Sequence, residues 1–378
     1  MKRSGFNRRS FIRNTATAAA GMLIVPSISH GSIGAPFISR NMKPRIRFSV
    51  IGINHGHINS QVETVIEGGG EFVSFYAKEP DLSAAFAKRF PQAKVARSIE
   101  EILNDKSIHL VVSAAIANER APLGIEVMRH GKDFLADKPG VLTLDQLKDV
   151  RKVQKETKRI YAILYGERLE NKATIRAGEL VKQGAIGKVI QTIGLGPHRL
   201  NAPSRPAWFF NKKQYGGILV DIATHQCDQF LFFTGSTKAE VVASQVGNFN
   251  HPQYEMEDFG DAMVKGDGGT GYMRVDWFTP DSLKTFGDTR LTVLGTEGYI
   301  EVRKNVDLAG REGGNHVFLV NNKETRYVES NDVELTYGRL LVDDIINRTE
   351  TAMTQEHCFL AAELAIRAQD QAKNITSK

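Results

Sequence analysis

The chain has 378 residues, of which 24% are charged and 41% are hydrophobic, a composition typical of a globular protein large enough for two domains. The formal net charge is +6, but five basic residues lie within the first 13 positions, so the rest of the chain carries a charge of about +1. This balance argues against a basic surface for nucleic acid or for an anionic membrane.

Residues 1–35 are predicted to be an export leader. The stretch Arg8-Arg9-Ser10-Phe11-Ile12-Arg13 precedes a weakly apolar segment at 15–28, and this pattern is typical of twin-arginine (Tat) signals. The segment is shorter than the roughly 20 apolar residues that span a bilayer, so no stable membrane anchor is expected. We expect a periplasmic protein that receives its cofactor before export by the Tat machinery and holds it tightly. The alternative is a basic N-terminus without a targeting role.

Residues 44–164 alternate between predicted strands and predicted helices. The strands are expected at 46–52, 72–76, 109–114, 133–136 and 160–164. The helices are expected at 82–89, 98–103, 121–130 and 144–156. This alternation predicts a doubly wound parallel sheet with helices on both faces, which is the Rossmann type of nucleotide-binding domain.

Residues 165–378 have a different pattern and are predicted to form an α+β domain with a large, mainly antiparallel sheet, because short glycine-rich turns separate the strands. The strands are expected at 189–195, 240–248, 261–265, 271–279, 289–294 and 299–303. Helices are expected at 173–183, 337–347 and 355–372, and we expect the last two to pack back across both domains.

Four motifs occur at positions that match one family. They are Gly52-Ile53-Asn54-His55-Gly56-His57, Ala136-Asp137-Lys138-Pro139, Trp208, and the segment from Gly216 to Asp221 with His225 after it. With these motifs the chain resembles the Gfo/Idh/MocA oxidoreductases. The resemblance implies a nicotinamide cofactor, a sugar or polyol substrate, and assembly into a homo-oligomer.

The glycine loop after the first strand is expected to bind the cofactor. Glycine lets backbone N–H groups approach a dinucleotide pyrophosphate, and Gly52 and Gly56 fit this need. Asn54 and His57 stand where the family has its second and third glycine, and asparagine tolerates left-handed backbone geometry better than most residues. His55 and His57 form a His-x-His pair that also suggests a metal, but we assign both to the cofactor loop.

Three further residues are expected near the cofactor, namely Lys78, Asn118 and Asp137. Ala77 occupies the place where NAD-binding Rossmann domains carry an acidic residue that holds the ribose hydroxyls, and Lys78 follows it. The absence of this carboxylate and the presence of a nearby ammonium favour NADP. If Lys78 is only a solvated surface residue, it favours neither cofactor. The choice between NAD and NADP therefore stays open.

Lys138, Asp221 and His225 are the expected catalytic residues. Lys138 follows a parallel strand, at the edge where open α/β sheets bind ligands, and the resemblance implies that it orients the substrate hydroxyl and shares its proton. Asp221, His225 and Asp228 are spaced i, i+4 and i+7, which predicts one face of a helix. The resemblance implies that His225 is the general base and that Asp221 orients the substrate or the imidazole. A solvated face or a metal site are the alternatives, and we expect no metal.

Substrate contacts are expected from Arg168, His198 and Trp208, because the resemblance places such residues around a polyol pocket. The main hypothesis is an exported NAD(P)-dependent oxidoreductase that acts on a CH–OH group. One alternative is a redox-neutral glycosidase or lyase that acts through a transient keto-sugar. The other is a coenzyme-free sugar-binding accessory protein, suggested by Asn54, His57 and Ala77.

Overall fold

Strand β1 (Ile46–Ile51) lies in the middle of the first sheet. Its side chains are buried on both faces of the sheet, as is typical of a central parallel strand. The computed structural model describes residues 44–376, so the predicted leader lies outside the described residues. All six strands are parallel, in the order β3-β2-β1-β4-β5-β6. The other strands are β2 (Gly70–Tyr76), β3 (Lys94–Val95), β4 (Leu110–Ser113), β5 (Asp133–Asp137) and β6 (Tyr161–Leu164). The predicted Rossmann-type sheet is confirmed.

Helices connect these strands, and two of them begin where a hydroxyl side chain caps the first turn. Ser98 accepts a hydrogen bond from the backbone of Glu101, and Thr143 accepts one from Gln146. The helices are α1 (Ile58–Glu67), α2 (Pro80–Arg89), α3 (Ile99–Asn104), α4 (Ala117–Arg129) and α5 (Leu144–Thr157). None of the helices within residues 44–376 is long and apolar enough to cross a membrane.

The strand order reverses between β1 and β4, and this reversal places the glycine loop. The chain runs outward from β1 through β2 and β3 and then returns to β4 on the other side of β1. Backbone hydrogen bonds join the two strand ends, because Ala114 donates to Gly52 and His55 donates to Ala114, each at 3.0 Å. Ligands of open α/β sheets bind at such a reversal, outside the carboxyl ends of the strands.

The second sheet has nine strands in the order β14-β13-β12-β11-β7-β10-β9-β8-β15. It is mainly antiparallel, as predicted, although β10 pairs with β7 and β15 with β8 in parallel. Its strands are β7 (Val189–Pro197), β8 (Ala239–Gly247), β9 (Phe259–Gly266), β10 (Thr270–Asp276), β11 (Arg290–Gly295), β12 (Gly298–Arg303), β13 (His316–Asn321), β14 (Thr325–Val328) and β15 (Lys373–Asn374).

Two strands that the sequence did not predict, β13 and β14, extend this sheet at one edge. They form a hairpin in which the backbone of Asn321 donates to Glu324. β14 has only four residues, two of them exposed. Its extended conformation therefore depends on pairing with β13 rather than on a strong local pattern.

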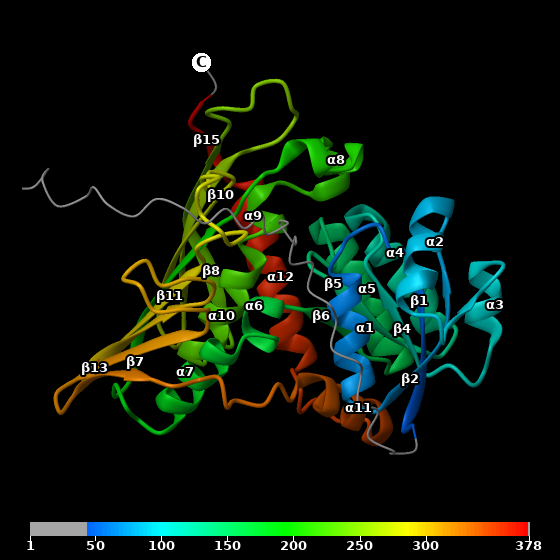
Figure 1. Cartoon of the computed structure of the whole chain (residues 1–378), viewed down its shortest axis with the longest axis horizontal. Coiled ribbons are helices and arrows are strands. Elements are labelled where there is room, and N and C mark those ends of the chain that lie inside the picture. The colour runs from blue at the N-terminus through cyan, green and yellow to red at the C-terminus, as the bar shows by residue number, and fades with distance from the viewer. Residues whose placement is uncertain (1–43, 377–378) are drawn as a thin grey trace, which may run out of the picture. The chain divides into compact units, whose positions relative to one another are not determined.

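The remaining helices surround the second sheet or connect it to the first. They are α6 (Gly166–Leu169), α7 (Lys172–Lys182), α8 (Lys212–Tyr215), α9 (Ile218–Asp221), α10 (Thr224–Thr234), α11 (Tyr337–Asn347) and α12 (Gln355–Asp370). Helix α12 contacts both sheets (Figure 1). Its first residue, Gln355, accepts a hydrogen bond from the backbone of Tyr161 in β6, and Ala368 near its end accepts one from Ser244 in β8.

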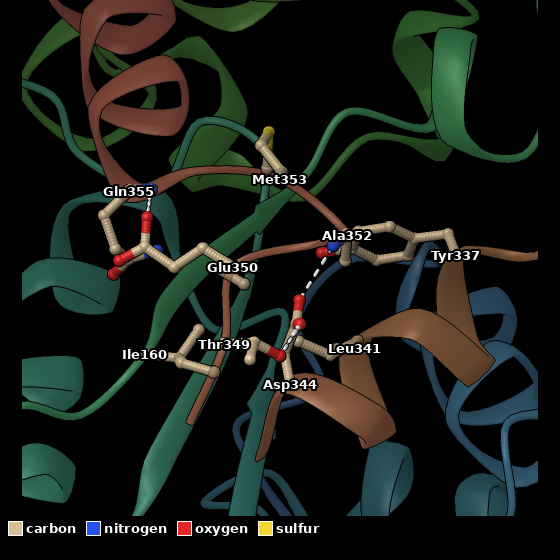
Figure 2. Close-up of a pocket in the computed structure, with 10 residues that line it drawn as sticks. Ile160, Tyr337, Leu341, Asp344, Thr349, Glu350, Ala352, Met353 and Gln355 are labelled. Atoms are coloured by element: carbon tan, nitrogen blue, oxygen red, sulfur yellow. Dashed lines mark hydrogen bonds between the residues drawn. The ribbon is translucent and has the colours of Figure 1, made fainter. Parts of the chain in front are cut away.

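The connection between α11 and α12 encloses a cavity of about 10 Å³, shown in Figure 2. The carboxylate of Asp344 accepts hydrogen bonds from Thr349, from Thr351 and from the backbone of Ala352. The hydrogen bonds of Asp344 stabilise the connection, and the cavity, which has room for about one water molecule, is too small for a sugar.

Candidate functional site

The glycine loop needs glycine at one position and leaves open space at another. Gly52 has φ +81°, and a Cβ added there would lie 2.5 Å from the Cβ of Ala115, so no larger residue fits. A Cβ at Gly56 would meet no atom within 4 Å. Asn54 does not have a positive φ. Its amide instead donates to Glu79 at 2.8 Å and ties the loop to the segment after β2.

The N-terminus of α1 lies directly after this loop and can hold an anion. His57 is the N-cap residue, it makes no side-chain capping hydrogen bond, and the first turn has no acidic residue. The helix dipole favours negative charge at such an end. With the open space at Gly56, these features fit the pyrophosphate of a nicotinamide dinucleotide.

The side chains expected near the adenosine and nicotinamide ends lie in different surroundings. Lys78 is exposed and lies 3.6 Å from the carboxylate of Glu119. Glu79, which the sequence analysis did not assign, lies beside the loop through its bond to Asn54. The Oδ1 atom of Asn118 is buried without a hydrogen-bond partner in the described part of the chain, so a ligand can satisfy it.

The carboxylate of Asp137 contacts the two histidines of the glycine loop and Arg120, and its expected role in cofactor binding stays a prediction. Its two carboxylate oxygens accept from the Nδ1 atoms of His55 and His57 at 2.7 and 2.9 Å, and Arg120 contacts it at 3.1 Å. Burial raises the pKa of Asp137, but the charges of Arg120 and the two histidines outweigh burial and hold that pKa well below its usual value. The carboxylate therefore stays ionised and holds both imidazoles of the loop.

Lys138 and Asp221 form a buried ion pair that joins the end of β5 to the end of α9. The ammonium donates to the Oδ1 atom and to the backbone carbonyl of Asp221, each at 2.9 Å. Burial raises the pKa of Asp221, but the charge and hydrogen bond of Lys138 lower it below the ordinary value. Asp221 thus orients Lys138 rather than the imidazole of His225, and the alternative expectation that it orients the substrate stays a prediction.

The predicted continuous helix through Asp221, His225 and Asp228 is also corrected. Asp221 ends α9, and α10 begins at Thr224 after a break. Asp228 is fully buried and accepts a bidentate ion pair from Arg168, at 2.7 and 2.6 Å. Because its guanidinium is bound in this way, Arg168 is not placed to contact a substrate.

His225 is buried within the electrostatic reach of Lys138, although the two come from different domains. Burial lowers the pKa of His225 from 6.5 to about 3, against the opposing charge of Glu167. Its Nδ1 atom has no hydrogen-bond partner within the described residues. The imidazole is therefore neutral and has an acceptor or donor available to a ligand.

Glu167 and Lys304 belong to this site and were missed by the sequence analysis. The ammonium of Lys304, at the end of β12, lies 2.6 Å from the Oε2 atom of Glu167, which also accepts from Gln226. Burial raises the pKa of Glu167, but Lys304, His225 and His198 lower it to about 2. Glu167 could have been found from the sequence, because it follows the last strand of the parallel sheet, at the edge where ligands bind.

Trp208 lies beside the loop histidine His55, and His198 lies within the electrostatic reach of Glu167 and Lys138, while their expected substrate contacts stay predictions. The ring of Trp208 lies edge-on to that of His55, with centroids 6.4 Å apart, and its indole N–H is buried without a partner among the described residues. His198 makes a hydrogen bond to the carbonyl of Gly196, and burial lowers its pKa to about 4. The Oε1 atom of Glu167 is likewise buried without a partner. A polyhydroxylated ligand carries the donors and acceptors that these atoms lack.

Comparison with known proteins finds one family over both domains. Residues 46–165 match the oxidoreductase family with an NAD-binding Rossmann fold, and residues 174–301 match the GFO/IDH/MocA C-terminal domain. A crystal structure of a candidate oxidoreductase from Erwinia carotovora atroseptica SCRI1043 is 47% identical in sequence, with a TM-score of 0.85. The match covers 88% of this chain and 100% of the chain in that crystal structure.

Two curated relatives are more distant in sequence. The scyllo-inositol 2-dehydrogenase (NAD(+)) of Bacillus subtilis strain 168 is 23% identical over 344 residues, which are 88% of this chain and 96% of the relative. The 1,5-anhydro-D-fructose reductase of Ensifer adhaerens is 26% identical over 182 residues, which are 46% of this chain and 52% of the relative. The match therefore spans about half the length of the reductase.

Proposed function

This chain belongs to the Gfo/Idh/MocA family of oxidoreductases, and on that premise we propose that it transfers a hydride between a CH–OH carbon of a sugar or polyol and a nicotinamide cofactor. The observation that carries the proposal is the buried pair of Lys138 and Asp221 beside His225. It brings an ammonium from the Rossmann domain to an imidazole of the second domain. These are the groups that a CH–OH unit needs when its carbon gives a hydride to the cofactor and its hydroxyl gives a proton to a base.

The cofactor fits the loop through Gly52, Gly56 and the uncapped start of α1. When bound, the nicotinamide supplies the hydride chemistry, while the chain positions the substrate and handles the proton. With a pKa of about 3, His225 is a weak base in the ligand-free protein. The fixed positive charge of Lys138 must therefore stabilise the substrate oxygen as its proton moves toward the imidazole.

We propose that NAD is preferred over NADP. Asn54 holds the carboxylate of Glu79 at 2.8 Å, beside the glycine loop. The carboxylate oxygens can accept hydrogen bonds from the ribose hydroxyls of NAD, and the negative charge repels the 2′-phosphate of NADP. Lys78 is paired with Glu119 at the exposed surface and is therefore less available to a phosphate.

The substrate of the proposed reaction is a neutral polyol or sugar. The buried atoms without a hydrogen-bond partner among the described residues include a carboxylate oxygen of Glu167 and the indole N–H of Trp208. A carboxylate accepts hydrogen bonds from hydroxyl groups and repels an anion. This supports a hydroxyl-rich, uncharged ligand.

The test begins with denaturation of the purified full chain and an assay of the supernatant for nicotinamide nucleotide. The protein is then mixed with NAD⁺ or NADP⁺ and a panel of polyols and aldoses, and reduced nicotinamide is followed by its absorbance. We expect released or added nucleotide to bind and at least one polyol to reduce it. Absence of both release and binding would refute the proposal. Cleavage of aryl glycosides without net reduction would favour the redox-neutral alternative.

Export and assembly are further parts of the proposal. The pair Arg8 and Arg9 supports Tat-dependent export to the periplasm with a tightly held cofactor. We expect the double Arg→Lys variant to remain in the cytoplasm, and unchanged export would contradict this. Exposed apolar side chains on the second sheet, Ile193, Val242 and Met263 among them, support a homo-oligomer. Light scattering of the purified protein measures its mass.

A further inference from the structure

We propose that His55, His57 and Asp137 bind a divalent transition-metal ion. One ligand atom from each of the three side chains lies within 4.8 Å of the others. The residues come from the loop after β1 and from the end of β5, so two different strand ends bring them together. The site goes beyond the proposed hydride transfer, and because it shares the loop assigned to the cofactor, it is proposed for the chain without bound nucleotide.

The geometry allows a metal with small movements. The two Nδ1 atoms lie 2.7 and 2.9 Å from the oxygens of Asp137. Zinc bonds to nitrogen and oxygen are about 2.0–2.2 Å long, which places neighbouring ligand atoms roughly 3.3 Å apart in a tetrahedral site. Each pair therefore has to widen by about half an ångström, which side-chain rotation can supply.

The chemistry of the donors selects the kind of metal. Arg120 contacts the same carboxylate at 3.1 Å and offsets its charge, so the two imidazoles are the main donors. Imidazole suits zinc, copper and nickel, whereas calcium and magnesium prefer sets of oxygen ligands. The site is therefore expected to take Zn²⁺ in preference to Mg²⁺.

The cluster is also accessible. The side chain of His57 is 50% exposed and that of His55 is 20% exposed, while Asp137 is 2% exposed. The buried carboxylate is thus the base of the site, and the imidazoles form its open side. A metal held there keeps free positions for water or for an oxygen atom of a ligand.

The experiment uses the untagged full chain after treatment with a chelator and removal of the chelator. Titration with ZnCl₂ in a calorimeter is expected to show one bound ion per chain, and MgCl₂ is expected to show none. His55→Ala and His57→Ala are each expected to weaken Zn²⁺ binding by tenfold or more. The matched control is His130→Ala at the end of α4, which is expected to bind like the unmodified chain.

Circular dichroism and melting temperature confirm that each variant is folded. Bound Co²⁺ provides a second measurement, because a low-symmetry site of nitrogen and oxygen ligands changes its visible absorption. No stoichiometric Zn²⁺ binding, or equal binding by the chain and both loop variants, would overturn the proposal. Nucleotide binding is measured separately on the metal-free protein, so failure of the metal site and failure of the oxidoreductase proposal remain distinguishable.

Discussion

The ammonium of Lys138 donates to both the side chain and the backbone carbonyl of Asp221, each at 2.9 Å. The two residues are 83 positions apart: Lys138 directly follows β5 of the parallel sheet, and Asp221 ends α9 in the second domain. This pair fixes the direction of the lysine side chain without a bound substrate, so a substrate oxygen meets a charge that is already oriented.

Lys138→Met is expected to remove most turnover, at least 100-fold in kcat/KM, because it deletes the charge that stabilises the substrate oxygen. Asp221→Asn keeps the shape of the partner but weakens the orientation of Lys138, so we expect a smaller loss. Steady-state kinetics on folded variants measure both. Near-normal rates for Lys138→Met would contradict the assigned role.

Stability is expected to fall between pH 7 and pH 5, partly because of His225. Its pKa is about 3 in the folded chain, below the ordinary 6.5, so in this window the unfolded chain binds the proton and the folded chain does not. Stability therefore rises with pH, by about 1 to 2 kcal/mol for this histidine. Chemical unfolding at both pH values measures it. His225→Asn should show a smaller difference between the two pH values, and an unchanged difference would contradict the lowered pKa.

Two glycines of the loop are expected to respond differently to alanine. Gly52→Ala forces a Cβ to within 2.5 Å of Ala115 at a positive φ, and we expect a loss of more than about 1 kcal/mol in stability. Gly56→Ala meets no neighbouring atom, so the fold should keep its melting temperature. Its methyl group enters the space assigned to the pyrophosphate, so nucleotide affinity should fall. Unchanged affinity in a nucleotide titration would place the cofactor elsewhere.

The charge of Glu79 is expected to set the cofactor preference. Glu79→Gln retains the bond to Asn54 but removes the negative charge beside the loop. The ratio of kcat/KM for NAD⁺ to that for NADP⁺ should fall by about tenfold, which corresponds to about 1.4 kcal/mol. Lys78→Ala is the matched control, since its ammonium is exposed and paired with Glu119. If the control alone shifts the ratio, Lys78 determines the preference.

Asp228 is expected to act on stability rather than on chemistry. Asp228→Ala leaves the buried guanidinium of Arg168 without its bidentate partner, which typically costs about 3–5 kcal/mol. Urea unfolding measures this loss. If the variant kept full stability but lost substrate affinity, Arg168 would be assigned to substrate binding instead.

Much of the architecture follows from local sequence patterns. Alternating apolar runs and helical periodicity predicted both sheets and the Rossmann order of elements, and Gly52 predicted the turn after β1. The motifs also named Lys138 and His225, which the fold brings within electrostatic reach of one another, while their catalytic roles stay predictions. Such patterns are visible because the residues that make them are neighbours in the chain.

The partners of the charged residues were decided only by the tertiary structure. Asp137 binds the loop histidines, Glu167 binds Lys304 across 137 positions, and Asp228 binds Arg168. Spacing within one helix suggested a common face for Asp221 and Asp228, but the break after α9 separated them. A buried charge is stabilised by whichever opposite charge the fold brings within a few ångströms, and sequence distance does not encode that proximity.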